Sequence, residues 1–158
     1  DWEFVLAGTA DYDNPSAVPA EEVKSWVDEG IIEWWGHCEN MAEVLSQVSI
    51  VCLPSYREGM PKSLLEAAAA GCAVITTDAI GCRDAIIPGV TGDLVPVADH
   101  AKLANAFLNL MDDEKKRSDY GKAGRLLARR RFDIKAVINQ TIHIYEILSN
   151  SNSMNSHI

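Results

Sequence analysis

Two carboxylates frame a segment of this sequence whose residue types and spacing suit ligand chemistry. Glu58 stands in a short loop, and Glu66 follows eight positions later within a helical pattern. A carboxylate accepts hydrogen bonds from paired hydroxyl groups, such as those of a sugar or a ribose. It repels phosphate, so a phosphate bound between two glutamates needs other partners. Two glutamates at this spacing, taken alone, are far more typical of solvent-facing side chains beside a helix than of a ligand site.

The residues between the glutamates can supply the partners that a phosphate needs. The loop Pro54–Pro61 leads directly into a predicted helix over Lys62–Ala70, which Gly71 ends. The first turn of a helix offers unpaired N–H groups and a positive dipole end, and both favour an anion. Gly59 lets the backbone come close to a ligand. The segment therefore predicts a nucleoside diphosphate sugar, with its sugar at Glu58, its diphosphate at the helix start and its ribose at Glu66.

The elements around this segment alternate between strand and helix patterns. Strands are predicted at residues 2–7, 31–35, 50–53, 73–76 and 93–97, and helices at 21–29, 41–48 and 62–70. Short connections between alternating elements indicate an α/β domain with a mostly parallel sheet and right-handed crossovers. In such sheets, ligands bind outside the carboxyl ends of the strands, and the loop after residue 53 lies at such an end.

From about Asp99 the pattern becomes purely helical. It contains three apolar stripes, which we expect to be core contacts: Leu103, Ala104, Phe107, Leu108 and Met111; Tyr120, Ala123, Leu126 and Leu127; Ile134, Val137, Ile138, Thr141, Tyr145 and Leu148. Residues 149–158 are rich in Ser and Asn and are predicted to form a disordered tail. We therefore expect one domain over residues 1–148.

Composition and the remaining motifs narrow the classes of function. The net charge of −9 disfavours nucleic acid as a partner. The four cysteines form no C-x-x-C pair, which indicates reduced thiols rather than a disulfide frame or a zinc site. Asp11 and Asp13 form an Asp-x-Asp pair, but their polar loop with Asn14 and Pro15 favours turn chemistry over metal binding. Neither a G-x-G-x-x-G fingerprint nor a Walker A loop is present.

The pattern P-S-x-x-E-G-x-P-x-x-L-L-E-A-x-A-x-G from Pro54 to Gly71 resembles the signature of family-4 retaining glycosyltransferases, including their E-x7-E motif. The run from Pro88 to Pro96 and the strand segments 5–8 and 32–36 look like other parts of the same domain, so the resemblance covers roughly residues 1–148. These enzymes have the GT-B fold, in which two Rossmann-like domains face each other across the active site. The resemblance implies the C-terminal, donor-binding domain: a Rossmann-like parallel sheet flanked by helices, with further C-terminal helices. It also implies that a first strand and helix and the whole acceptor-binding domain are missing.

The resemblance carries roles to individual residues. Glu58 would be the catalytic residue and would hold the donor sugar. The segment that follows would present backbone donors to the diphosphate: Gly59, Met60, Pro61, Lys62 and Ser63. Glu66 and Leu64 would contact the ribose and base, and the loop at Gly36, His37 and Cys38 would cradle the base. The family is metal-independent, so no metal and no cofactor are expected.

The activity implied is transfer of a sugar from a nucleotide sugar, with a UDP-linked hexose or N-acetylhexosamine as the expected donor. The acceptor would be a saccharide or a lipid-linked molecule bound through the missing domain, in bacterial polysaccharide or glycoconjugate synthesis. This chain alone would bind the donor weakly and transfer nothing. A cytoplasmic location follows, with peripheral attachment of the full enzyme to the inner face of the membrane as a further expectation. A nucleotide-sugar epimerase of the same fold and a noncatalytic nucleotide-sugar-binding module remain as alternatives.

Overall fold

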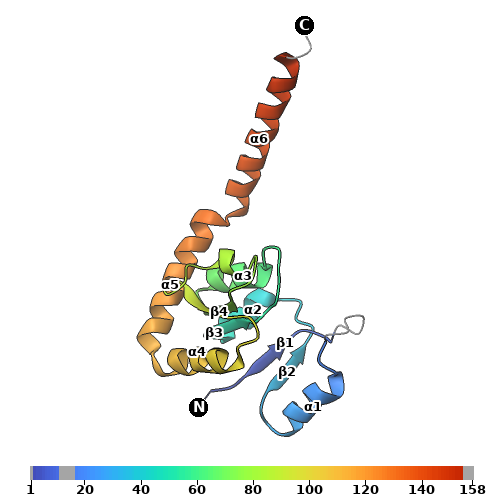
Figure 1. Ribbon diagram of the computed structural model, residues 1–158, viewed down its shortest axis with the longest axis vertical. Coiled ribbons are helices and arrows are strands. Elements are labelled where there is room, and N and C mark those ends of the chain that lie inside the picture. The colour runs from blue at the N-terminus through green and yellow to red at the C-terminus, as the bar shows by residue number, and fades with distance from the viewer. Residues whose placement is uncertain (1, 11–16, 155–158) are drawn as a thin grey trace. The chain divides into compact units, whose positions relative to one another are not determined.

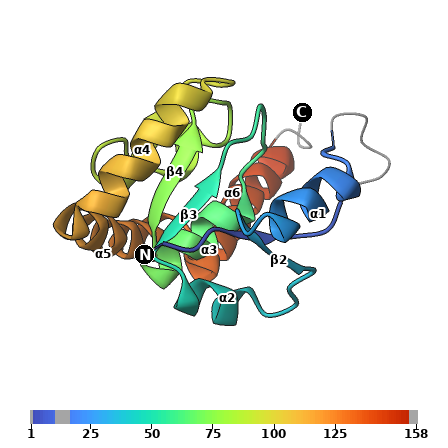
Figure 2. The same ribbon diagram turned by 90° about the horizontal axis from the view of Figure 1, so that it is seen from below.

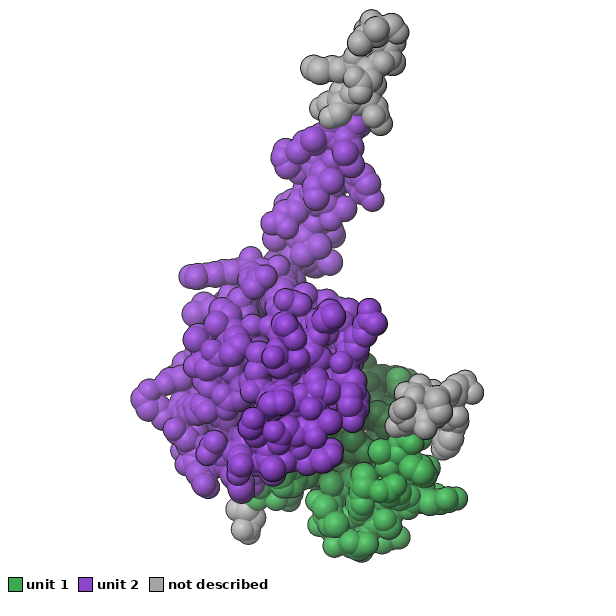
Figure 3. Space-filling view, in the orientation of Figure 1, with its two compact units in different colours: residues 1–47 green, residues 48–158 purple. Residues whose placement is uncertain are grey.

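The computed structural model describes residues 2–10 and 17–154, with side chains described as far as residue 149. The chain divides into two compact units, residues 1–47 and residues 48–158 (Figure 3). The domain expected over residues 1–148 stays a prediction. Strand and helix periodicity report local structure only, so they cannot show which strands pair with one another.

The first unit contains a two-stranded parallel sheet. Strand β1 (Val5–Ala7) pairs with β2 (Glu33–Gly36), and helix α1 (Ala20–Asp28) lies between them in sequence (Figure 1). Helix α2 (Met41–Gln47) follows. The ends of both strands are tied together, because the Gly8 amide donates to the Gly36 carbonyl at 2.7 Å. The Trp34 indole N–H donates to the Gly8 carbonyl at 2.8 Å.

The second unit contains a three-stranded parallel sheet in the order β3-β4-β5. Its strands are Ile50–Leu53, Ala73–Thr77 and Gly92–Val95. Helix α3 (Lys62–Ala70) forms the crossover between β3 and β4, and the short 3₁₀ helix η1 (Arg83–Ala85) lies between β4 and β5. Parallel sheets flanked by helices confirm the predicted α/β class. Within the described residues the five strands form two separate ladders, where one sheet was expected.

Helices cover both faces of the β3-β4-β5 sheet. On one face, Ala73, Ile75 and Val95 pack with Ala106 and Leu110 of α4 (His100–Asp112) and with Tyr120 of α5 (Glu114–Arg131). Toward the other face, α3 buries Leu64, Ala67 and Ala68. Figure 2 shows α4 on one side of β3 and β4 and α3 on the other. Every residue of β4 is buried, which explains its almost uninterrupted apolar sequence.

Helix α5 packs closely against α3 and fixes its C-terminal end. The Arg125 guanidinium donates to the carbonyl oxygens of Ala69 at 3.2 Å and Ala70 at 2.5 Å, which are among the last acceptors of α3. Gly121 lies so near the chain after α3 that a Cβ atom there would stand 2.0 Å from the Gly71 carbonyl oxygen. This close approach lets α5 hold the helix that begins at the proposed phosphate site.

Helix α6 (Ile134–Met154) corrects two expectations. Its apolar stripe was predicted to be buried, yet Val137, Ile138, Tyr145 and Leu148 are all exposed. Figure 1 shows the helix extending away from the sheet of the second unit. Its last residues also continue the helix into the predicted disordered tail, and residues 155–158 lie outside the described residues. An amphipathic period identifies an apolar face, but it does not identify what covers that face.

The close contact of α5 with the end of α3 gives a test of the packing. We expect Gly121→Ala to lower the free energy of unfolding by about 1–3 kcal/mol, because the added methyl group forces the backbones apart. Gly124→Ala is the matched control on the same helix, since its Cβ would meet Ala68 atoms at an ordinary 3.6 Å. It should be neutral or stabilise by up to about 1 kcal/mol through helix propensity. Chemical denaturation of both variants measures the difference, and equal stability would contradict the close contact.

Candidate donor site at the end of the second sheet

The loop between β3 and α3 is held against the end of β4. The Thr76 hydroxyl donates to the Leu53 carbonyl at 2.8 Å, and the Thr77 hydroxyl donates to the Ser55 carbonyl. The Glu58 amide donates to the Ile80 carbonyl at 3.1 Å. All of these contacts lie at the carboxyl ends of neighbouring parallel strands, the place where α/β sheets bind ligands.

Close packing completes this attachment at Gly81. Gly81 has φ +82° and is buried, and a Cβ atom there would stand 2.2 Å from the Gly59 oxygen and 2.4 Å from the Glu58 oxygen. A larger residue would therefore clash with the backbone of the loop as well as strain its own backbone. The turn that contains Gly81 is closed by Arg83, whose guanidinium pairs with the Asp78 carboxylate at 3.0 Å.

The Glu58 carboxylate has a defined partner within the loop. The Ser55 hydroxyl donates to Glu58 Oε1 at 2.8 Å, and both residues are half-buried. A carboxylate oxygen accepts more than one hydrogen bond, so this contact orients Glu58 and leaves it able to accept bonds from a ligand hydroxyl. The sequence analysis named Ser55 within the motif but gave it no role.

Helix α3 begins at Lys62, as predicted, with Pro61 at its N-cap position. Within the described residues, no side chain caps this end by a hydrogen bond, and the first turn holds no acidic residue. The positive end of the helix dipole is therefore not offset locally, which favours an anion there. Met60 is exposed beside it, and the Ser63 side chain is half-buried.

Glu66 lies one turn further along α3 and forms an ion pair with Lys62 at 3.2 Å. Their side chains are 34% and 86% exposed, respectively. An exposed pair of this kind contributes little stability, so a ligand can replace Lys62 as the partner of Glu66 at small cost. Leu64, in contrast, is completely buried on the inward face of α3. The helical period turns its side chain into the core, and its predicted role toward the ribose or base stays a prediction.

A cavity of about 440 Å³ adjoins Glu66 between α3 and the junction of α5 with α6. The residues that line it come from all three helices: Lys62, Leu65, Glu66, Ala69, Ala128, Arg129, Phe132, Asp133 and Ile134. The residue type and position of Arg129 do not by themselves associate it with Glu66. The fold brings it to the same cavity as Glu66, although more than sixty positions separate the two residues.

Gly36 and His37 belong to the first unit, whereas the other predicted site residues belong to the second. Gly36 ends β2 with φ +64°, and its carbonyl accepts hydrogen bonds from the Gly8 amide and from the Cys38 thiol. His37 is exposed. The predicted base contacts at these residues stay predictions.

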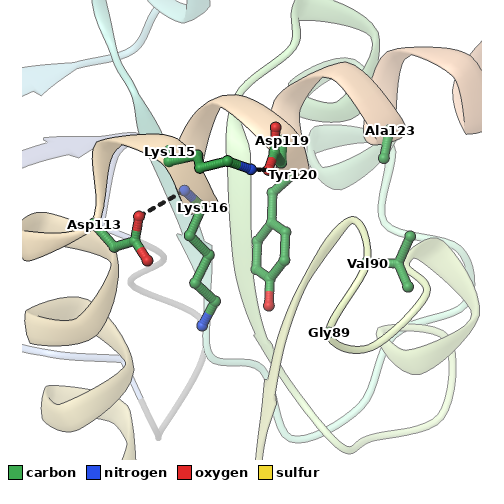
Figure 4. A pocket seen from close by; sticks show the side chains of 8 residues that line it. All are labelled: Gly89, Val90, Asp113, Lys115, Lys116, Asp119, Tyr120 and Ala123. Atoms are coloured by element: carbon green, nitrogen blue, oxygen red, sulfur yellow. Dashed lines mark hydrogen bonds and ion pairs between the residues drawn. The ribbon is translucent and has the colours of Figure 1, made fainter.

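A second cavity, of about 460 Å³, lies beside the N-terminal half of α5 (Figure 4). It contains none of the predicted donor residues. Its lysines are paired: Lys115 with Asp119 at 2.5 Å, and Lys116 with Asp93 at 2.9 Å. Asp93 also accepts a hydrogen bond from Tyr120 at 2.7 Å, which links β5 to α5. Asp93 stands near the amino end of β5, so this network fastens α5 to the sheet away from the loop at Glu58.

In the part of the chain that the structure describes, none of the four cysteines forms a disulfide, and no group of three or more His, Cys, Asp or Glu side chains is placed to hold a metal ion. The Asp11–Asp13 pair lies outside the described residues, so its predicted turn role and the expected metal independence stay predictions. Among the described helices, none has the length and apolar character needed to cross a membrane.

Comparison with known proteins gives the family. A sequence profile described as glycosyl transferases group 1 matches residues 1–113, and the chain belongs to this family. An N,N'-diacetylbacillosaminyl-diphospho-undecaprenol α-1,3-N-acetylgalactosaminyltransferase of Campylobacter jejuni is 35% identical over 75% of this chain and 30% of its own length. The chain thus spans about a third or less of the curated relatives it matches.

Solved structures show the same architecture. A sucrose-phosphate synthase of Thermosynechococcus elongatus matches with a TM-score of 0.81 and 27% identity, over 93% of this chain and 38% of that chain. The C-terminal domain of a glycosyl transferase group 1 family protein (LpcC) of Francisella tularensis matches with a TM-score of 0.62 and 27% identity. The match covers 72% of this chain and 60% of that chain. The predicted family and the predicted GT-B-type fold are therefore confirmed.

The buried thiols give a test that is independent of any ligand. Burial raises the pKa of Cys52 to about 12 and also raises that of Cys72. Because the thiolate is the reactive form, we expect iodoacetamide at pH 8 to modify Cys52 far more slowly in the folded protein than in denaturant. Mass spectrometry of digested samples measures both rates. Rapid native modification of Cys52 would contradict its burial.

The raised pKa also predicts that the free energy of unfolding falls as pH rises from about 9 toward 12, because the thiol of the unfolded chain loses its proton first.

Proposed function

We propose that this chain is the donor-binding part of a retaining glycosyltransferase that transfers a sugar from a nucleotide sugar to a saccharide or lipid-linked acceptor. The observation that carries the proposal is the Glu58–Glu66 segment of a glycosyl transferases group 1 chain, set at the carboxyl ends of β3 and β4. The segment offers acceptors for hydroxyl groups on either side, in sequence, of a helix start suited to phosphate.

Each part of the donor has a partner of matching chemistry. Glu58, oriented by Ser55, accepts hydrogen bonds from the hydroxyl groups of the sugar. The backbone at Gly59–Ser63 and the positive end of α3 bind the diphosphate, and exposed Lys62 adds a mobile positive charge. When the donor binds, Glu66 gives up its ion pair with Lys62 and accepts hydrogen bonds from the paired hydroxyls of the ribose. We expect the base to be uracil, and the base contacts predicted at Gly36 and His37 of the first unit stay predictions.

This arrangement favours departure of the diphosphate. Bond breaking at the anomeric carbon places negative charge on the diphosphate, and fixed N–H groups stabilise that charge more in the transition state than in the ground state. An acceptor hydroxyl would then bond to the anomeric carbon on the same face and pass its proton to the oxygen of the leaving diphosphate, with retention of configuration. Glu58 acts by positioning the sugar through its hydroxyl groups. No metal is required in this scheme, because the helix start and basic groups carry the charge of the leaving group.

The acceptor would bind outside this chain. The relative named for transfer to a diphospho-undecaprenol molecule is more than three times as long as the segment it shares with this chain. We propose that the active enzyme includes a second, acceptor-binding domain and works in the synthesis of bacterial surface saccharides, at the inner face of the membrane. The chain of 158 residues would then bind donor without transferring it.

A panel of UDP-, GDP- and ADP-sugars, titrated by calorimetry into the protein that carries this chain, tests the proposal. We expect binding of a UDP-hexose or UDP-N-acetylhexosamine and label transfer to a saccharide or lipid-linked acceptor. Conversion of the donor to an epimer would favour the epimerase alternative, and stable binding without chemistry would favour a noncatalytic module. Absence of binding by every member of the panel would reject the proposed function.

Substitution of Glu58 distinguishes binding of the sugar from binding of the nucleotide. Glu58→Gln keeps the size of the side chain but removes its charge, so we expect at least about a tenfold weaker affinity for the nucleotide sugar and a lower turnover. Affinity for the free nucleoside diphosphate should be unchanged, because that ligand lacks the sugar. Calorimetry with both ligands checks this difference. Normal sugar affinity together with normal turnover would remove Glu58 from the site.

Substitution of Glu66 should affect both ligands equally. We expect Glu66→Gln to weaken the nucleoside diphosphate and the nucleotide sugar by the same factor, roughly tenfold, because both carry the ribose. Lys62→Gln also removes the Lys62–Glu66 ion pair and weakens the diphosphate contact, but it should keep the preference for a ribonucleotide over a dideoxynucleotide, because Glu66 is retained. A 2′,3′-dideoxynucleotide should bind equally to the unaltered and Glu66→Gln proteins. Discrimination against that ligand only in the Glu66→Gln protein would contradict the ribose role.

A further inference from the structure

Two adjacent threonines at the end of β4 make the same kind of hydrogen bond to different parts of the chain. Thr76 and Thr77 are 0% and 2% exposed. Each hydroxyl donates to a backbone carbonyl at the end of β3 or just beyond it. Thr76 reaches Leu53, its own partner in the β3–β4 ladder. Thr77 reaches Ser55, two residues beyond the end of β3 and inside the loop that carries Glu58.

The difference matters because Ser55 is the residue that orients Glu58. The backbone of Ser55 is held by Thr77, and its side chain donates to Glu58 Oε1 at 2.8 Å. The ladder already fixes Leu53, so its carbonyl would stay in place without Thr76. Ser55 lies outside the ladder, so its carbonyl depends on Thr77.

We propose that Thr77 is a positioning residue for the donor sugar: it acts through Ser55 to set the direction of the Glu58 carboxylate. Gly81 supports the same arrangement from the other side, because only a residue without a Cβ atom leaves room for the carbonyls of Glu58 and Gly59. The end of β4 thus determines how Glu58 meets a ligand, although Thr77 is itself buried away from that ligand. The role rests on the proposed function only for the identity of the ligand as a nucleotide sugar.

Thr77→Val tests the proposal, with Thr76→Val as its matched control. Both changes remove one buried hydroxyl and keep the branched shape, in neighbouring residues of one strand. For the protein that carries this chain, calorimetry gives affinities for UDP and for UDP-N-acetylgalactosamine. We expect Thr77→Val to weaken the nucleotide sugar about three- to tenfold while leaving UDP unchanged, and Thr76→Val to preserve the ratio of the two affinities. Thr77→Ser, which keeps the hydroxyl, should restore the ratio.

A crystal structure of the Thr77→Val protein supplies a readout that needs no ligand. We expect Ser55 Oγ and Glu58 Oε1 to move beyond hydrogen-bonding distance, while the β3–β4 ladder is retained. An unchanged Ser55–Glu58 bond would overturn the proposal. An equal loss of affinity for UDP and for the nucleotide sugar would overturn it as well. So would the same change in the ratio of the two affinities in Thr76→Val, because either result reports general destabilisation.

The two proposals fail in different ways. If Glu58→Gln leaves the affinity ratio unaltered, the sugar-binding role of Glu58 fails, whatever Thr77→Val does. If Glu58→Gln lowers sugar affinity but Thr77→Val changes neither that affinity nor the Ser55–Glu58 bond, the positioning role fails and the donor site stands.

Discussion

The attachment of the loop after β3 to the end of β4 is the interaction on which the candidate site depends. A loop that follows a parallel strand has no ladder of its own, so its backbone must find partners elsewhere. Here Thr77, the Ile80 carbonyl and the space at Gly81 supply them. Thr77 is the last residue of β4, which is buried along its whole length, and Ile80 and Gly81 follow shortly after it. The direction of Glu58 is thereby set by the core.

Helix α3 packs against β4 and is part of the same core. Its N-terminal end leaves N–H groups available for an anion, while its C-terminal end is held by Arg125 and by the close approach of Gly121 to Gly71. A helix fixed at one end can present fixed dipoles at the other, so binding a phosphate requires little rearrangement. Preorganisation of this kind is what makes backbone N–H groups effective toward a leaving diphosphate. The small residues on α5 therefore contribute to the site from a distance, through the position of α3.

The charged cluster beside α5 shows how similar residue types can serve a different purpose. Lys116, Asp93 and Tyr120 satisfy one another, and Lys116 also lies 5.1 Å from the centre of the Tyr120 ring. At the candidate site, in contrast, the ion pair that the structure gives Glu66 is with the exposed Lys62 and is weak. Groups that pair fully within the protein stabilise the fold, whereas a weakly paired carboxylate can exchange its partner for a ligand.

The sequence by itself determined the α/β class, the family and the bounds of α3 and β3, because these follow from local periodicity and from spaced motif residues. It also placed Glu58 and Glu66 in one segment. It could not determine that Ser55 contacts Glu58, that Thr77 holds Ser55, or that Arg129 adjoins the cavity at Glu66, since these contacts join residues through the fold. It misplaced the apolar stripe of α6 for a related reason. Apolar character says that a side chain favours burial, and only the tertiary structure decides whether another element or a ligand covers it.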